Sequence, residues 1–438
     1  MRFPVFHAIA LAFAVIAGAP AVAQPAAPST QPAEPTALEA RSLQVVELLN
    51  GEVQPEAIFT AGFRAAIADA QIRTLSTNLT TQFGRAVEVS LLAPRDGTRA
   101  ALEIRFERGI AKGAIALDPA ENDRINELRF TSVDALAIAG DTPEKIVADL
   151  AALPGQVNAW FGPLDGGAAV IRLRADVPLA VGSAFKLYVL AALAEDVKDG
   201  RRRWSDVVAL TERSYPSGQL QNWPQGAPVT LHTLASLMIS ISDNTATDQL
   251  IKELGKERIL ALMGESHRNP YLNQPLLTTR ELFVTKADKG LTELRRRGRR
   301  GDEDALIFYR ALLDAPERPV TLDEVNAAFA NGPKALDVEW FASPEDFARL
   351  FAFMRGEADP EVFRIMAINP SASPAILANW VYVGFKGGSE PGVFNLTWLL
   401  TDRQGRDWVL SLGWNNPEAV VDEGKLEAIA QRILLLPR

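Results

Sequence analysis

Ser183-Ala184-Phe185-Lys186 follows Val181-Gly182 and precedes the apolar run from Leu187 to Leu193. This pattern predicts that Ser183 lies in the first turn of a helix whose body is buried. A serine and a lysine three residues apart are common on helix surfaces, so the tetrapeptide alone has little weight. Two further motifs follow in the chain, Ser242-Asp243-Asn244 and then Lys386-Gly387-Gly388. The three motifs in this order predict a serine acyl-transfer site.

The chemistry of the serine explains the spacing. A serine hydroxyl is a poor nucleophile at its free pKa and needs a base within hydrogen-bond reach. Lys186 projects from the same helix face as Ser183, and a lysine that is desolvated among cations can lose its proton near neutral pH. The N-terminus of a helix also directs backbone N–H groups at an oxyanion that forms beside the serine. One helical turn can therefore supply the nucleophile, the base and one oxyanion donor.

The three motifs resemble those of the penicillin-recognising serine enzymes, and most closely those of class A β-lactamases, over roughly residues 140 to 438. The resemblance implies that Ser183 is the acylated nucleophile, that Lys186 is its base and that Ser242 passes a proton to the leaving nitrogen. It also implies that Asp243 holds its loop.

The same resemblance suggests a set of substrate contacts. Asn244 would bond the side-chain amide of the substrate, and Lys386 would face its carboxylate. The substrate-binding residues would also include Gly388 and Ser389. The backbone N–H groups of Ser183 and Ser389 would form the oxyanion hole.

Two departures from the family pattern concern substrate binding and deacylation. The third motif usually has threonine or serine where this chain has Gly387, so one hydroxyl for the substrate carboxylate is missing unless Ser389 restores it. The family's Glu-x-x-Leu-Asn segment is matched by Asn269-Pro270-Tyr271-Leu272-Asn273, which places an amide where the deacylating glutamate belongs. An amide cannot take a proton from water, so we expect slow deacylation. Glu265 and Glu281 are the nearby candidates for the base.

A narrower resemblance fits these departures. The segments from Pro275 to Phe283 and from Lys386 to Gly392 resemble β-lactamase-like serine hydrolases typified by a protein of clavulanic acid biosynthesis. In that group a domain like a steroid isomerase precedes the β-lactamase-like domain, which implies the same order here.

The start of the chain has the pattern of an exported protein. Residues 1–23 combine Arg2, an apolar stretch and Ala21-Val22-Ala23, which predicts a cleaved signal peptide and no membrane span afterwards. Residues 24–35 are rich in proline and alanine and predict a linker. The chain has no cysteine, which excludes disulfides, lipid attachment at cysteine and thiol catalysis. We expect secretion, most simply into a bacterial periplasm.

Two folded domains are predicted after this leader. Residues 36–140 show helical patterns over 38–49, 56–67 and 72–83, followed by alternating strand patterns, so we expect an α+β unit. Its layout is similar to the cone of steroid isomerases and nuclear transport factor 2. Its simplest role is packing and positioning of the second domain. Residues 141–438 have strand patterns over 167–173 near the start and over 380–385, 393–401 and 408–414 near the end, with helices between them. This order predicts a class A β-lactamase-like α/β domain, with an antiparallel sheet, flanking helices and an all-helical half.

Several other functions are disfavoured by composition. The net charge is −9, and no aromatic residues interleave the basic run from Arg295 to Arg300, so we expect a solvated turn there and no nucleic-acid partner. His232 and His267 have no ligand-type neighbour at metal-binding spacing, so no metal site is predicted. The motifs require no cofactor.

We therefore expect a secreted serine hydrolase that acts on a small β-lactam or a peptidoglycan-like molecule, with β-lactam hydrolysis as the first hypothesis. A peptidoglycan D-Ala peptidase or a carboxyl esterase is the alternative, because the same nucleophile serves amides, lactams and esters. A protein of another class, a weakly catalytic binding protein that stays acylated, is the third hypothesis. Turnover distinguishes the binding protein from the two enzymes, because an enzyme regenerates free Ser183 and a binding protein that stays acylated does not.

Overall fold

The computed structural model describes residues 35–135, 141–298, 307–308, 311 and 321–437. The predicted signal peptide and most of the predicted linker lie outside these residues. The described part has no helix that is long and apolar enough to cross a membrane.

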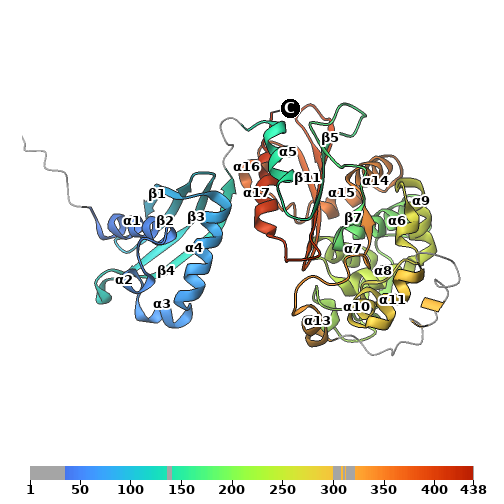
Figure 1. Ribbon diagram of the computed structural model, residues 1–438, viewed down its shortest axis with the longest axis horizontal. Helices are drawn as coiled ribbons and strands as arrows, with labels where there is room; N and C mark the ends of the chain where they lie inside the picture. Colours follow the sequence, from blue (N-terminus) through green and yellow to red (C-terminus); the bar gives the residue numbers. More distant parts are fainter. Residues whose placement is uncertain (1–34, 136–140, 299–306, 309–310, 312–320, 438) are drawn as a thin grey trace, which may run out of the picture. The chain divides into compact units, whose positions relative to one another are not determined.

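The N-terminal region contains helices and a four-stranded antiparallel sheet (Figure 1). The sheet has the strand order β1-β2-β3-β4, and its strands are β1 (Ala86–Pro94), β2 (Arg99–Phe106), β3 (Gly109–Asp118) and β4 (Arg124–Ala135). Helices α1 (Ala37–Leu49) and α4 (Asp69–Phe83) share an apolar core with the sheet. The helix expected over residues 56–67 is instead two short helices, α2 (Pro55–Ile58) and α3 (Ala61–Ala66), because the Thr60 hydroxyl caps α3 by accepting from Phe63 N.

The C-terminal region is built on a five-stranded antiparallel sheet of order β11-β12-β13-β5-β6. The last three strands of the chain, β11 (Tyr382–Glu390), β12 (Val393–Thr401) and β13 (Asp407–Asn415), pair in sequence order. Next to them lie β5 (Gln156–Pro163) and β6 (Ile171–Leu173), so the two ends of this region share one sheet. The sequence patterns predicted a strand over 167–173 but missed β5. Strand β11 forms one edge of the sheet.

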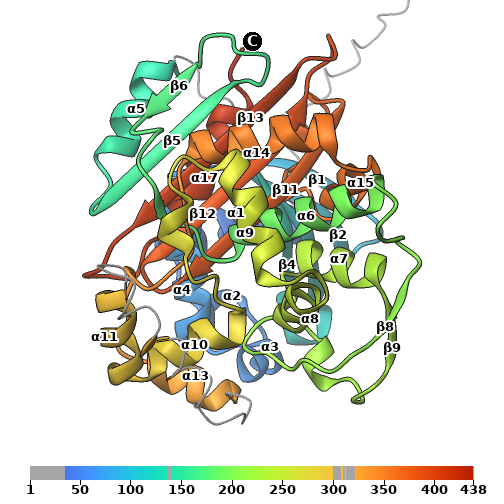
Figure 2. The ribbon, with the colours of Figure 1, turned by 90° about the vertical axis from the view of Figure 1, so that its right-hand side faces the viewer.

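Helices cover both faces of this sheet. Helices α5 (Pro143–Ala151) and α17 (Glu423–Leu434) share one core with side chains of β12 and β13, including Leu400 and Leu410. The other face packs against α14 (Pro344–Glu357) and the all-helical half (Figure 2). The sheet, the flanking helices and the helical half agree with the prediction for the C-terminal region.

The helical half carries the first two motifs. Its elements up to residue 273 are η2 (Gly182–Phe185), α6 (Lys186–Lys198), η3 (Leu220–Asn222), α7 (Leu231–Ser240), α8 (Asn244–Leu254), α9 (Lys256–Ser266) and η4 (Pro270–Asn273). Short two-stranded pairings join β7 (Leu179–Ala180) to β10 (Phe341–Ala342) and β8 (Val207–Ala209) to β9 (Pro228–Thr230).

The described residues of the long segment between α9 and α14 include the helices α10 (Thr279–Ala287), α11 (Lys289–Gly298) and α13 (Leu322–Phe329). The expectation of a turn at the arginine run is wrong for its first three members, which lie in helix α11. Arg295 is buried and donates to the carbonyls of Gln274 and Pro275, and Arg296 forms an ion pair with Asp337. Arg299 and Arg300 lie outside the described residues. The remaining elements are η1 (Pro119–Glu121), α15 (Glu361–Met366) and α16 (Pro374–Leu377).

Candidate active site

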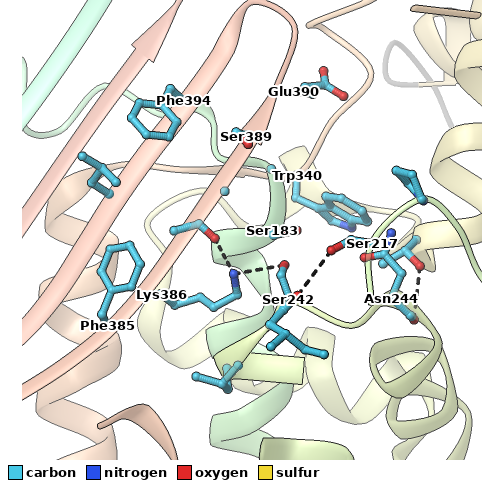
Figure 3. Close-up of a pocket in the computed structure, with 18 of the residues that line it drawn as sticks. Ser183, Ser217, Ser242, Asn244, Trp340, Phe385, Lys386, Ser389, Glu390 and Phe394 are labelled. Carbon is cyan, nitrogen blue, oxygen red and sulfur yellow. Dashed lines mark hydrogen bonds between the residues drawn. The ribbon is translucent and has the colours of Figure 1, made fainter. Parts of the chain in front are cut away.

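Ser183 lies in the short 3-10 turn η2, directly before the buried helix α6, which begins at Lys186. Ser183 lines a cavity of about 600 Å³ together with residues of the other two motifs (Figure 3). Its hydroxyl has no hydrogen-bond partner among the described residues. The hydroxyl is therefore available to a molecule that enters the cavity.

The backbone of β11 lies directly against the turn that holds Ser183. A Cβ atom at Gly388 would lie 2.2 Å from the Val181 carbonyl oxygen and 2.4 Å from Ser183 N, so only glycine fits this position. A Cβ atom at Gly182, whose φ is +49°, would lie 3.2 Å from Ser389 N. Ser183 and Ser389, whose backbone N–H groups are expected to form the oxyanion hole, thus lie on two adjoining backbone segments. No side chain separates these segments. Ser389 also lines the cavity.

The Ser242-Asp243-Asn244 motif forms the turn between α7 and α8. Asp243 caps α8 by accepting from Ala246 N, and its other carboxylate oxygen accepts from the backbone N–H groups of Gln219 and Leu220. Ser242 has a φ of +58°, a left-handed conformation that is uncommon for a residue with a side chain. The surrounding contacts hold this conformation, which directs the Ser242 hydroxyl toward two lysines.

These two lysines meet at the Ser242 hydroxyl. Lys186 Nζ lies 3.1 Å from Ser242 Oγ and also donates to the Ser242 carbonyl oxygen and to Asn244 Oδ1. Lys386 Nζ reaches Ser242 Oγ at 3.1 Å from the β11 side (Figure 3). The Ser242 hydroxyl can therefore exchange protons with either lysine.

Both lysines have lowered pKa values. Burial, together with repulsion from Lys386, holds the pKa of Lys186 well below its usual range, although Asp248 and Asp243 oppose this shift. Burial lowers the pKa of Lys386 to about 7. A lysine in this environment can be a neutral amine near neutral pH, which is the form that accepts a proton.

Asn244 has both ends of its side chain engaged. Its Oδ1 accepts from Lys186 Nζ at 2.7 Å, and its Nδ2 donates to the Tyr215 carbonyl oxygen at 3.1 Å. Asn244 lines the cavity, but in this state it orients Lys186. A contact from Asn244 to a substrate amide requires one of these bonds to be exchanged.

Neither of the two glutamates expected as candidates for the deacylation base lines the cavity. Glu265 is an exposed residue of α9 and does not line the cavity. Glu281 caps α10 through Thr278 N and forms an ion pair with Lys256. Asn269 is also exposed and does not line the cavity.

The cavity wall contains groups that sequence reasoning missed. Trp340 stacks on Phe185, with ring centroids 3.7 Å apart and an interplanar angle of 7°. Next to Trp340, Glu339 lines the cavity with Glu390, and both carboxylates pair with the buried Lys286. No local sequence signal marks this cluster, because its members come from three distant segments.

The two histidines that were weighed as metal ligands each lie near one carboxylate. His232 Nε2 lies 3.2 Å from one carboxylate oxygen of Glu361, and His267 Nε2 lies 3.6 Å from one of Asp346. Across the described ranges, no group of three or more histidine, cysteine, aspartate or glutamate residues could hold a metal ion.

An antiparallel sheet that packs against an all-helical half, with a serine and two lysines between them, is the arrangement expected of β-lactamase-like serine enzymes. Comparison with protein families agrees with this class. The model of the β-lactamase enzyme family matches residues 142–431, and the chain belongs to this family. A search of curated proteins gives no match.

Several solved structures are similar to the chain. The β-lactamase from Sphaerobacter thermophilus DSM 20745 is 21% identical, with coverage of 68% of this chain and 97% of that chain and a TM-score of 0.45. The structure of PBP-A is 18% identical, with coverage of 67% and 93% and a TM-score of 0.46. A β-lactamase from Chitinophaga pinensis DSM 2588 is 16% identical, with coverage of 66% and 96% and a TM-score of 0.44.

Proposed function

We propose that this protein is a serine hydrolase that forms an acyl-enzyme at Ser183 on β-lactams and releases the product slowly. The observation that carries the proposal is the convergence of Lys186 and Lys386 on the Ser242 hydroxyl, in the cavity that the unpaired Ser183 hydroxyl lines. Membership of the β-lactamase family supports the substrate class.

Acylation follows from this geometry. Ser183 Oγ attacks the lactam carbonyl carbon, and its proton moves to the neutral amine of Lys186. The backbone N–H groups of Ser183 and Ser389 stabilise the oxyanion that develops. The C–N bond then breaks, and the Ser242 hydroxyl gives its proton to the leaving nitrogen and regains one from the protonated Lys186. The products of this step are an ester at Ser183 and an opened ring.

Deacylation needs a second base that activates a water molecule. Among the described residues, three carboxylates line the cavity, and two of them, Glu339 and Glu390, are paired with Lys286. The third, Glu427, belongs to α17, which packs on the opposite face of the sheet from the helical half. The cavity therefore holds the groups that acylation needs, whereas none of these carboxylates is placed as a base for deacylation. We expect deacylation to limit turnover.

Mixing the protein with excess penicillin tests this proposal. We expect a rapid burst of ring opening, with an amplitude equal to the enzyme concentration, followed by a slow steady state. Stopped-flow absorbance measures both phases. A linear time course with rapid turnover would refute slow deacylation, and the absence of any burst or turnover would refute the β-lactam substrate.

The pKa of Lys386 predicts how substrate affinity depends on pH. Burial lowers this pKa to about 7, so Lys386 loses its positive charge as the pH rises through that value. We expect the dissociation constant of a carboxylate-bearing β-lactam to rise above pH 7, approaching about tenfold per pH unit as the protonated fraction falls. An activated ester without a carboxylate is the control and should show no such rise. A carboxylate substrate with flat affinity from about pH 6 to pH 9 would remove Lys386 from carboxylate binding.

The remaining predictions concern the N-terminal part of the chain. We propose export to the periplasm on the basis of the leader pattern in residues 1–23. We also propose that residues 36–140 form a steroid-isomerase-like cone that positions the catalytic domain, which the combination of helices and a four-stranded antiparallel sheet supports.

A further inference from the structure

Three buried ionisable side chains form a cluster in the cavity wall. Lys286 Nζ lies 2.9 Å from Glu339 Oε1 and also bonds Glu390, and the side chains of the three residues are 0%, 1% and 6% exposed. Lys286 belongs to α10, Glu339 precedes β10, and Glu390 is the last residue of β11. One ammonium group thus joins three separate segments.

The Lys286 ammonium group stays charged near neutral pH. Burial disfavours the charge on Lys286, but the attraction of Glu339 and Glu390 outweighs burial and raises its pKa. Burial also raises the pKa of Glu390 to about 8, although Lys286 opposes the rise. A buried ion pair is weak evidence for stability, and a fixed geometry is a better-attested use of such a pair.

Each of the three segments contributes to the cavity wall or adjoins a group that does. Glu390 follows Ser389, whose backbone N–H is one oxyanion donor in the proposed function. Glu339 precedes Trp340, which stacks on Phe185 in the same 3-10 turn as Ser183. The third segment, α10, lines the cavity with Thr279, Leu282 and Phe283. Lys286 is therefore connected through Glu390 to one oxyanion donor, and through Glu339 and Trp340 to the turn that holds the other.

We propose that Lys286 is a positioning residue that holds the backbone N–H of Ser389 opposite that of Ser183 and so sets the rate of acylation. This inference rests on the proposed acylation at Ser183. Loss of one oxyanion donor slows comparable enzymes by about 10²–10³-fold, and a displacement of about 1 Å costs about 10²-fold. A donor that is displaced rather than removed belongs in the lower part of this range.

The test separates the acylation rate constant from the dissociation constant of the non-covalent complex, by stopped flow with a chromogenic cephalosporin. For Lys286→Met we expect the rate constant to fall by about 10²-fold, while the dissociation constant changes little. Loss of fold alone would lower the active fraction and leave the rate constant of the remaining active enzyme unchanged. Lys256→Met is the matched control, because Lys256 pairs with Glu281 of the same helix, outside the cavity wall.

A single substitution leaves two buried carboxylates without their cation and can unfold the protein. The triple variant Lys286→Met, Glu339→Gln, Glu390→Gln removes the charges together and should keep a near-native melting temperature. We expect this variant also to acylate slowly. Wild-type acylation by the folded triple variant would overturn the proposal. Wild-type protein that shows no adduct at Ser183 would instead refute the proposed function, and with it this inference.

Discussion

Replacement of Ser183 by alanine is expected to abolish covalent labelling by a β-lactam or a fluorophosphonate. Ser183 is the only nucleophile in the proposed mechanism, and its hydroxyl has no hydrogen-bond partner among the described residues, so its removal leaves no orphaned polar group. The melting temperature should therefore stay close to that of the wild type. Intact-mass spectrometry after incubation with either reagent measures the labelled fraction.

Ser217→Ala is the matched control for this variant. Ser217 also lines the cavity, and its hydroxyl donates only a long hydrogen bond, 3.4 Å, to the Ile241 carbonyl oxygen. We expect Ser217→Ala to label like the wild type. If Ser183→Ala also labelled like the wild type, the assignment of the nucleophile would be wrong.

Replacement of Lys186 by alanine is expected to slow acylation by about 10²-fold or more, the usual scale for loss of a positioned base. The variant also removes the donor to the Ser242 carbonyl oxygen and to Asn244 Oδ1, so we expect a loss of about 1–3 kcal/mol in the free energy of unfolding. The labelling rate constant is measured below the melting temperature of the variant.

Lys252→Ala provides the comparison for Lys186. Lys252 is an exposed residue of α8 that bonds Glu212 at the surface, so its removal should change neither the labelling rate nor the stability by much. An unchanged labelling rate in folded Lys186→Ala would exclude Lys186 from the mechanism.

The sequence predicted strands correctly where apolar and polar residues alternate, or where turns bound an apolar run. Strand β12 (Val393–Thr401) is such a run and has the bounds expected from the sequence. Strand β5 was missed because Gln156–Pro163 contains asparagine, glycine and proline, and because most of its residues are buried by layers on both faces of the sheet. A strand that is buried on both faces loses the alternation by which sequence reasoning recognises it.

The three motifs were sufficient to predict the cavity, because Ser183, Ser242 and Lys386 each stand at a turn or strand with a local signature. The Lys286 cluster could not be predicted in this way. Its ion pairs join residues 53 and 104 positions apart, so they depend on the fold of the long segment between α9 and α14.

The central claim is that Ser183 carries a long-lived acyl group during turnover. The most direct measurement is the mass of the intact protein, quenched during steady-state reaction with a penicillin and, separately, with a cephalosporin, followed by peptide mapping of the adduct. The account predicts that most of the protein carries one added acyl group, on the peptide that contains Ser183. Unmodified protein during continuing turnover, or an adduct on another residue, would contradict it.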